Sequence, residues 1–490
     1  MTATLAIFSG YLLLTVGIGL WSARRGQDDQ EDYFLAGRSV PAFAMALSAV
    51  SSGRSAWLVL GAGGLAWRDG LSALWVFPGY ILAEALLFVT VGPRLRARSI
   101  EVSAVTLPEV FERLPEGPSG RGTSRLPVRA VTGTVIVLFL LTYVSAQLVA
   151  GGRTLGAIFP QIDGPTTGLV ITAGIVLLYT WLGGYRAVVL TDVVQAILML
   201  GGVVLLPLLG LHAVGGPAAL ASTLRQLDPA LLDPVRSWIG LLGGLAIGLG
   251  SVGNPHILVR HMSLRDPGEA RAAMLHGTLW NTLMAGGALL IGLVGRALYP
   301  ELADLGEGGR EVLYPVLARD LSASYLFPGF VGFLLATLFA AIMSTCDSQL
   351  LVIASSLARD LRPRRSAEAP RGRLAARLAV LLTLLLAVLL TFGESPLVND
   401  LVLLSWFALG CGLGPPLLVL LYDRRASAAG TLAGLLVGVA GIAGVEHLVL
   451  GETGGHISWE AAPVFVASML TALLLRRPAD RAAAPPEVGA

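Results

Sequence analysis

The chain has 490 residues, of which 54% are hydrophobic and 13% charged, and its mean hydropathy is +0.74. Soluble domains carry about 25% charged residues, so this composition excludes an ordinary soluble protein and indicates a chain embedded in a lipid bilayer. The net charge is only +2, and no nucleic-acid partner is expected.

Thirteen apolar runs are long enough to cross a hydrocarbon core of about 30 Å. They lie near residues 3–22, 41–66, 70–92, 129–150, 166–184, 188–212, 237–257, 273–296, 322–358, 374–392, 397–421, 428–449 and 460–475. We therefore expect an all-α integral membrane protein with about 13 transmembrane helices.

The arginines predict an orientation, because cytoplasmic loops of membrane proteins are rich in basic residues. All 34 basic residues are arginine, and with the N-terminus outside only seven of them lie on external segments. The cluster between Arg359 and Arg377 then lies inside. We expect a multi-pass protein of a bacterial-type cell inner (plasma) membrane, with its N-terminus outside and its C-terminus in the cytoplasm.

The run 41–66, PAFAMALSAVSSGRSAWLVLGAGGLAW, is rich in serine and glycine between Ser48 and Gly64. A hydrophobic segment interrupted in this way is typical of a discontinuous helix, whose freed carbonyls can coordinate an ion. The same small residues could instead serve only to bring helices close together. Arg54 lies in this segment, near the middle of the bilayer. It must pair with a carboxylate, bind an anionic group of a substrate, or face a water-filled cavity.

The run 322–358 contains FAAIMSTCDSQLL, which brings hydroxyls and a carboxylate to bilayer depth. At helical spacing Ala341, Ser344, Thr345 and Ser348 share one face, with Asp347 beside them. Hard oxygen ligands on one face suit a dehydrated alkali cation, although each hydroxyl could also bond to its own backbone or join two helices. An acid at the centre of a spanning helix costs about 2.5 to 3.5 kcal/mol on insertion scales, so Asp347 needs a partner inside the protein.

Other ionisable side chains within the apolar runs are Glu84, Asp192, His212 and His256. Asp192 could be an ion ligand or an interfacial acid near Arg186. We interpret His256 as a polar residue at a helix end. Glu84 could partner any of the buried bases or lie at a helix interface.

These residues lie in segments that resemble the sodium/solute symporter family, and most of all its proline symporter branch. The resembling segments occur in the family's order and are DYFLAGRS (32–39), the break at 51–61, TLPEVF (106–111), YTWLGGYRAVVLTDVVQ (179–195), GNPHILVRHM (253–262) and AAIMSTCDSQLLVIASS (340–356). Each motif alone is weak, but six in register make a specific match.

The resemblance implies a leucine-transporter-type inverted repeat, two halves of five helices with one leading and two trailing helices. The expected units are a leading helix and cytoplasmic loop (1–40), a first repeat (41–212), a second repeat (213–421), trailing helices (422–478) and a disordered cytoplasmic tail (479–490). The discontinuous helices, 41–66 and 237–257, would then meet at the bilayer midplane, where substrate binds.

The resemblance also implies two cation sites and a substrate pocket. The shared sodium site would use the backbone carbonyls of Ser51, Arg54 and Ala341 and the hydroxyls of Ser344 and Thr345. A second cation site would use Asp192, Ser344, Asp347 and Ser348. The substrate pocket would include Trp57 and Tyr143, together with Arg54, Ser55 and Ser251.

The chain departs from the proline symporter branch within the two discontinuous helices, 41–66 and 237–257. It has Gly53 where the branch has an aspartate, Arg54 where the branch is apolar, and Ile247 and Ser251 where the branch has aromatic residues. One hypothesis is that Arg54 pairs with Asp347 and its guanidinium takes over the role of sodium. A variant is that Arg54 faces the pocket and binds a substrate carboxylate.

The predicted function is secondary active transport, not catalysis. We expect sodium-coupled import, by alternating access, of a small organic solute such as proline or a related amino acid, with the lipid bilayer as the other partner. A first alternative is a sodium-independent or proton-coupled carboxylate transporter in which an Arg54–Asp347 pair replaces the ion. A second is a membrane sensor that does not transport. The sequence leaves the oligomeric state open.

Overall fold

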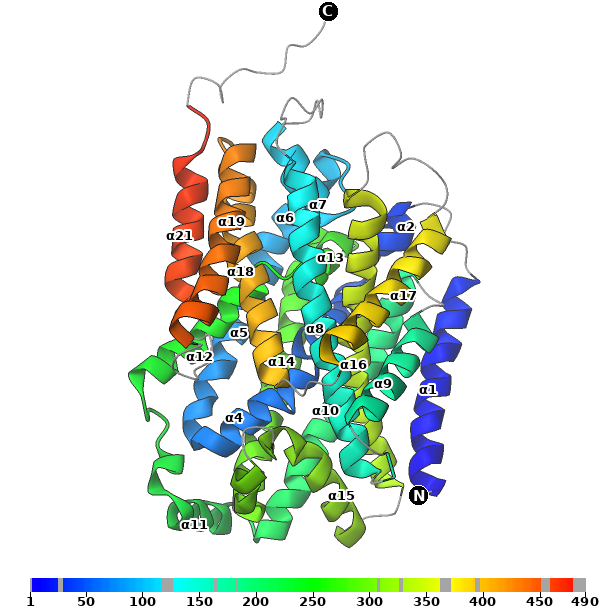
Figure 1. Cartoon of the computed structure of the whole chain (residues 1–490), viewed down its shortest axis with the longest axis vertical. Coiled ribbons are helices and arrows are strands. Elements are labelled where there is room, and N and C mark those ends of the chain that lie inside the picture. Colours follow the sequence, from blue (N-terminus) through cyan, green and yellow to red (C-terminus); the bar gives the residue numbers. More distant parts are fainter. Residues whose placement is uncertain are drawn as a thin grey trace, which may run out of the picture.

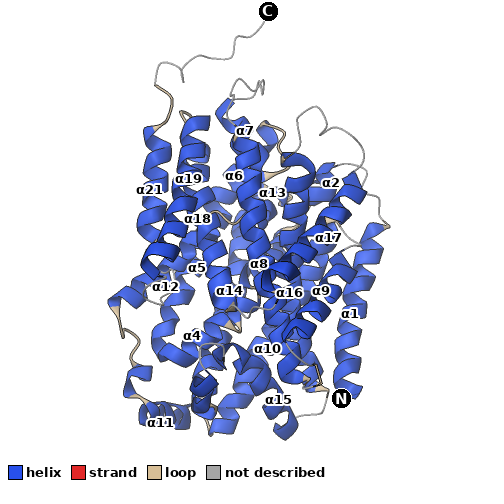
Figure 2. Ribbon diagram, viewed as in Figure 1, coloured by secondary structure: helices blue, strands red, loops and turns tan. Residues whose placement is uncertain are grey.

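The computed structural model describes residues 2–24, 30–116, 127–159, 161–162, 165–180, 184–305, 309–325, 329–361, 372–392, 397–450 and 459–478. Within these ranges every regular element is a helix, as Figure 2 shows. The predicted tail at 479–490 lies outside the described residues. The all-α fold class is confirmed.

Each of the thirteen predicted apolar runs coincides with a helix or with two helix segments joined at a break. These are α1 (Thr2–Ala23), α3 (Ala42–Arg54) with α4 (Gly61–Asp69), α5 (Val76–Leu86), α8 (Val128–Ile158), α9 (Pro165–Thr180), α10 (Tyr185–Val214), α12 (Trp238–Ser251) with α13 (Pro255–Ser263), α14 (Ala270–Leu298), α16 (Phe330–Ser355), α17 (Gly372–Thr391), α18 (Val398–Tyr422), α19 (Ala428–Gly444) and α21 (Ala461–Leu474). Shorter helices are α2 (Gln30–Leu35), α6 (Gly92–Glu101), α7 (Leu107–Arg113), α11 (Pro217–Leu227) and α15 (Leu313–Tyr325).

Among the described residues, eight helices are long and apolar enough to cross a membrane, or nine when the bent pair α12–α13 is taken as one span. The apolar parts of α9, α17 and α21 are shorter. The chain is therefore a multi-pass membrane protein, and the count of about 13 crossings stays a prediction.

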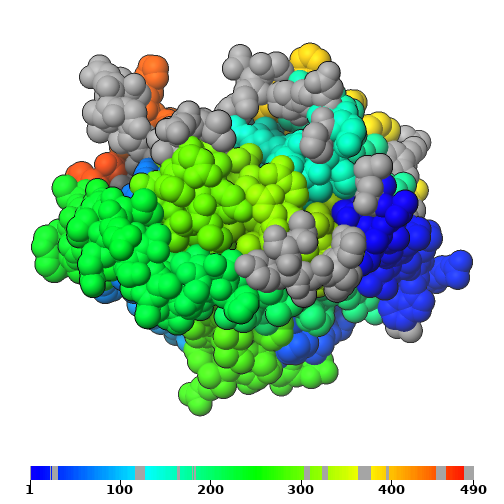
Figure 3. Space-filling model, turned by 90° about the horizontal axis from the view of Figure 1, so that it is seen from below, coloured from blue at the N-terminus to red at the C-terminus, as the bar shows by residue number. Residues whose placement is uncertain are grey.

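Most long helices run along the long axis of the molecule (Figure 1). Helix α1 begins at the lower end of this view and α21 finishes at the upper end. Seen from below, the lower face is covered mainly by the segment from α11 to α15, drawn in green (Figure 3). Helices α6 and α7, which carry several arginines, lie toward the upper end.

Helix α16 forms the centre of the bundle. Its apolar window is 89% buried, against 28% for α1, and α16 contacts α1, α3, α8 and α10. Helix α1 instead exposes leucines such as Leu13 and Leu14, as expected for a helix that faces lipid. The hydroxyls and the acid on α16 therefore face protein from all sides.

Both expected helix breaks are present. Helix α3 ends at Arg54, because Ser55 adopts φ +48° and ψ −173°, a conformation that cannot continue a helix. Helices α12 and α13 meet at an angle of 51°. At this second break the Asn254 side chain donates to the carbonyl of Gly250 over 2.7 Å and so satisfies an acceptor that the helix leaves free.

Candidate functional site

The break after α3 exposes backbone groups that side chains then satisfy. The Ala56 amide donates to Oε1 of Gln147 on α8 over 3.1 Å, and the Trp57 amide donates to Oγ of Ser55 over 3.1 Å. Serine and glycine are weak helix formers, which explains why the helix stops in SSGRS. The bonds hold the break open in one conformation and fix the direction of the Trp57 side chain.

Four of the five predicted sodium ligands, Ser51, Ala341, Ser344 and Thr345, come together at this break, with the carbonyl of Ser52 in addition. Oγ of Ser344 donates toward the Ser51 carbonyl over 3.2 Å, and Oγ1 of Thr345 donates to the Ser52 carbonyl over 3.0 Å. Both hydroxyls also lie within 3.2 Å of the Ala341 carbonyl. All of these residues are buried. Carbonyl and hydroxyl oxygens at an unwound helix are the ligands that alkali cations take in transporters, so the residues present fit sodium.

A cavity of about 270 Å³ lies on the other side of the break. Its walls are mainly aromatic and aliphatic, and its lining residues are Gly53, Arg54, Trp57, Tyr80, Tyr143, Ile247, Val402, Leu403 and Trp406. The cavity contains the predicted pocket residues Trp57, Tyr143 and Arg54.

The other two predicted pocket residues lie behind this wall. Oγ of Ser55 accepts a hydrogen bond from the Tyr143 hydroxyl over 3.4 Å, and Ser251 contacts the carboxylate of Glu84. The indole nitrogen of Trp57 donates to Oδ1 of Asn399 over 3.0 Å. Ser55 and Ser251 therefore support the side chains around the cavity without lining it.

The hypothesis that Arg54 pairs with Asp347 is wrong. The structure places Arg54 against Glu84 of α5, and Nη2 of the guanidinium donates to Oε1 of the carboxylate. Both side chains are buried, with 1% and 3% of their surface exposed. The guanidinium also lies 3.8 Å from the centre of the Tyr80 ring. No definite partner of Glu84 could be predicted from the sequence, because nothing in it shows that α5 packs beside the break.

The second predicted cation site also differs from the expectation. Asp192 and Ser348 do meet, but they meet around the guanidinium of Arg260 from α13. Nη2 of Arg260 lies 2.8 Å from Oδ2 of Asp192 and also donates to Oγ of Ser348. Ser48 and Ser52 complete the ring of oxygens around it. A fixed guanidinium therefore stands among the ligands that the resemblance implies for a cation.

Sequence reasoning missed Arg260. Its position inside the apolar helix PHILVRHM was the available signal, since an arginine there needs a buried partner. Asp347 lies beside this cluster, where Oγ of Ser348 is 3.2 Å from Oδ1 of Asp347, and Ser344 belongs to the sodium site described above. The four residues predicted for the second site are thus adjacent, but they do not surround one common point: two of them contact Arg260, and the other two lie beside it.

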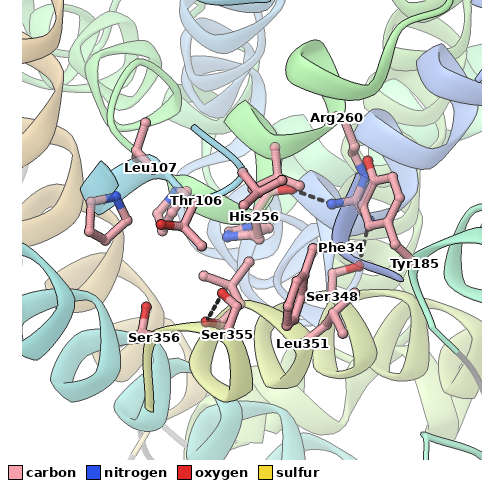
Figure 4. A pocket seen from close by; sticks show the side chains of 15 residues that line it. Phe34, Thr106, Leu107, Tyr185, His256, Arg260, Ser348, Leu351, Ser355 and Ser356 are labelled. Atoms are coloured by element: carbon pink, nitrogen blue, oxygen red, sulfur yellow. Dashed lines mark hydrogen bonds between the residues drawn. The ribbon is translucent and has the colours of Figure 1, made fainter. Parts of the chain in front are cut away.

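Arg260 lines a second cavity, which opens toward α7 (Figure 4). Thr106 and Leu107 at the start of α7, Tyr185 at the start of α10 and Ser356 at the end of α16 also line it. The Tyr143 ring lines the first cavity and meets the His256 ring, which lines the second, edge-on at 5.9 Å between centres. These two rings lie between the cavities.

A cluster of charges ties α7, α8 and the end of α16 together beyond this cavity. Oε1 of Glu109 lies within 3.4 Å of guanidinium nitrogens of three arginines, which are Arg113, Arg129 and Arg359. Burial raises the pKa of Glu109, but Arg359 and Arg113 lower it further, so the pKa lies below its ordinary 4.5. The cluster fixes this end of the bundle through charge.

The chain is similar to known transporters along nearly its whole length. It is 33% identical over 479 residues to the osmoregulated proline transporter OpuE of Bacillus subtilis, covering 96% of this chain and 94% of that protein. It is 30% identical over 492 residues to a sodium/proline symporter of Staphylococcus aureus, covering 97% and 92%.

A solved structure of a Na⁺-coupled sialic acid symporter, in a substrate-bound outward-open state, superposes with a TM-score of 0.75 at 20% identity and covers 96% of this chain and 98% of that one. This likeness confirms the leucine-transporter-type fold. The model of the sodium:solute symporter family matches residues 33–438. With these matches, the chain belongs to the sodium:solute symporter family.

Proposed function

We propose that this protein imports a small amino acid, with proline as the first candidate, by symport with sodium. The observation that carries the proposal is the meeting of Ser344 and Thr345 with the carbonyls of Ser51 and Ser52 at the break of α3. The same break presents Trp57 to a small apolar cavity. Ion site and solute site thus share one short segment, through which binding of one can favour binding of the other.

The neutral Arg54–Glu84 pair supports sodium as the coupling ion. An unpaired guanidinium beside the ligands would repel a cation by several kcal/mol at an effective dielectric constant near 20. Because Glu84 contacts the guanidinium directly, the two charges cancel and the repulsion falls. The alternative in which an Arg54–Asp347 pair replaces the ion loses its structural basis.

Proline is the first candidate because the relatives reported above are named as proline transporters. The aromatic walls contributed by Trp57 and Tyr143 suit a compact apolar ring.

The two cavities fit alternating access. The Tyr143 and His256 rings lie between the solute cavity and the cavity beside α7, so their separation would connect the two. We propose that α7 and the arginines near it face the cytoplasm, that both repeats are formed as the resemblance implies (41–212 and 213–421), and that the solute leaves past Arg260. The location in a bacterial-type cell inner membrane, with the N-terminus outside, is part of this proposal.

The experiment is uptake of radiolabelled proline into proteoliposomes, with an inward sodium gradient or with choline replacing sodium. We expect accumulation only with sodium, and collapse of the gradient should release the solute. Uptake that ignores sodium, or that follows a proton gradient instead, would overturn the coupling. No uptake of proline or of any other small amino acid would favour the membrane sensor that does not transport.

A further inference from the structure

The solute cavity has one charged residue in its wall. Arg54 lines it, and the other eight lining residues are uncharged. Glu84, which neutralises Arg54, is not among the lining residues and lies behind the guanidinium on α5. A solute in the cavity therefore meets the positive member of the pair first.

The guanidinium has donors left for a second partner. Arginine carries five N–H donors, and the described contacts of Arg54 use one of them, on Nη2, for Glu84. Nε of Arg54 is buried without a hydrogen-bond partner. A buried N–H with no acceptor is costly, so a solute acceptor that reached Nε would remove this penalty.

Glu84 is itself held in place. Nδ2 of Asn281 on α14 donates to Oε2 of Glu84 over 2.8 Å, and Oγ of Ser251 at the end of α12 lies 3.4 Å from Oε1. The Tyr80 ring covers one face of the guanidinium at 3.8 Å. Carboxylate and ring together fix the plane of the Arg54 fork, which is the geometry that recognises another carboxylate.

We infer that Arg54 is the residue that binds the carboxylate of the transported solute, and that Glu84 positions it. The inference rests on the proposed function and narrows its substrate class to small carboxylates with a compact apolar body. Aromatic rings in the wall, such as Trp57 and Tyr143, would face an ammonium group through cation–π attraction. An amino acid would then present its two ends to different groups of the same cavity.

The experiment compares ligands that differ only in the carboxylate. Equilibrium binding to the purified full-length protein is measured in sodium and in choline for proline and prolinamide, and for lactate and lactamide. The variants are wild type, Arg54→Lys and the double variant Arg54→Met with Glu84→Gln, which removes both charges and leaves neither unpaired.

Wild type should prefer each acid over its amide. In the double variant the affinity for the acid should fall about 10- to 100-fold, the range of a charge-assisted hydrogen bond, while the affinity for the amide stays within about threefold. The preference would then vanish. Arg54→Lys keeps the charge but loses the fork, so it should weaken acid binding about tenfold and leave amide binding unchanged. This variant tests the inference even if the double variant does not fold.

The outcomes distinguish the role proposed for Arg54 from the sodium-coupled transport proposed above. A double variant or an Arg54→Lys variant that binds the acids as wild type does would overturn the role of Arg54, even with sodium-dependent proline binding intact. Acid binding that is independent of sodium, yet lost in the variants, would uphold Arg54 and overturn the sodium coupling. Wild-type protein that shows no preference for acids over amides, or binds no member of either pair, would overturn the inference.

Discussion

Substitution of one member of the buried Arg54–Glu84 pair should lower the free energy of unfolding more than substitution of both. Glu84→Gln leaves the Arg54 guanidinium without a counter-charge, and if the new amide NH₂ turns toward it, two donors face each other. Oε1 and Oε2 of Glu84 also accept from Ser251 and Asn281, and the glutamine keeps only one acceptor oxygen where the carboxylate has two. Loss of one partner of a buried ion pair costs about 3–5 kcal/mol.

The second substitution should recover most of this loss. Arg54→Met on top of Glu84→Gln removes the unpaired charge and leaves a flexible thioether against the Tyr80 ring, a contact that sulfur favours. Replacement of a whole buried pair by neutral side chains is often neutral or stabilising. We expect the free energy of unfolding of the double variant to lie within about 1–2 kcal/mol of the wild-type value.

The assay is thermal unfolding of the purified protein in choline buffer without solute, because bound ligand would add its own stabilisation. A loss of about 3–5 kcal/mol corresponds to a fall in Tm of roughly 5 °C or more in a chain of this size. If Glu84→Gln unfolds at the wild-type temperature, or if Arg54→Met fails to raise the Tm of the Glu84→Gln protein, the pair is not the stabilising contact described here.

Three further predictions concern other parts of the site. Thr345→Ala should raise the sodium concentration for half-maximal proline uptake about tenfold or more, whereas Thr337→Ala, the same change on the same helix, should leave it unchanged. Gly250→Ala should lower the Tm and proline binding together, because its Cβ would meet the Trp406 ring at 1.9 Å, an overpacking that costs about 1–3 kcal/mol or more. The pKa of Glu109 is lowered by arginines around it, so its stabilisation is present above pH 4.5 and is lost as the pH falls below that value. Over this range the Tm of wild type should approach that of Glu109→Gln, and a constant gap would contradict the ion cluster.

The helices, and the grouping of hydroxyls on one face of α16, could be predicted from the sequence because both depend on short-range patterns. Apolar runs of sufficient length define spanning helices, and serine and glycine between Ser48 and Gly64 mark the break. The hydroxyls of Ser344 and Thr345 share a face through helical spacing alone. Their assignment to a sodium site follows from the resemblance and stays a prediction, and in the structure they contact the carbonyls of Ser51 and Ser52.

The ion pairs could not be predicted in the same way. Glu84 with Arg54, and Arg260 with Asp192, join residues 30 and 68 positions apart, and each base could in principle meet any of several buried acids. The choice depends on which helix faces pack together, and a hydrophobic pattern with little amphipathic character leaves those faces unmarked. Arg260 was missed for a further reason, since the sequence next to its helix contains other arginines and Arg260 was counted with them as part of a loop.

The position of Glu84 explains how the chain tolerates its departure from the proline branch at Gly53. A Cβ added to Gly53 would lie 3.5 Å from Oε1 of Glu84, so an aspartate at position 53 would put its carboxylate close to the same place. In this chain the acid beside the break comes from α5, and it contacts Arg54 directly. Gly53→Asp in this background would place a second carboxylate directly against Glu84, whereas a solute carboxylate would reach Arg54 from the cavity side, and like charges so close disfavour each other. A restored aspartate should therefore be accepted only together with Glu84→Gln, and a Gly53→Asp protein as stable as wild type would show that the two acids do not occupy the same place.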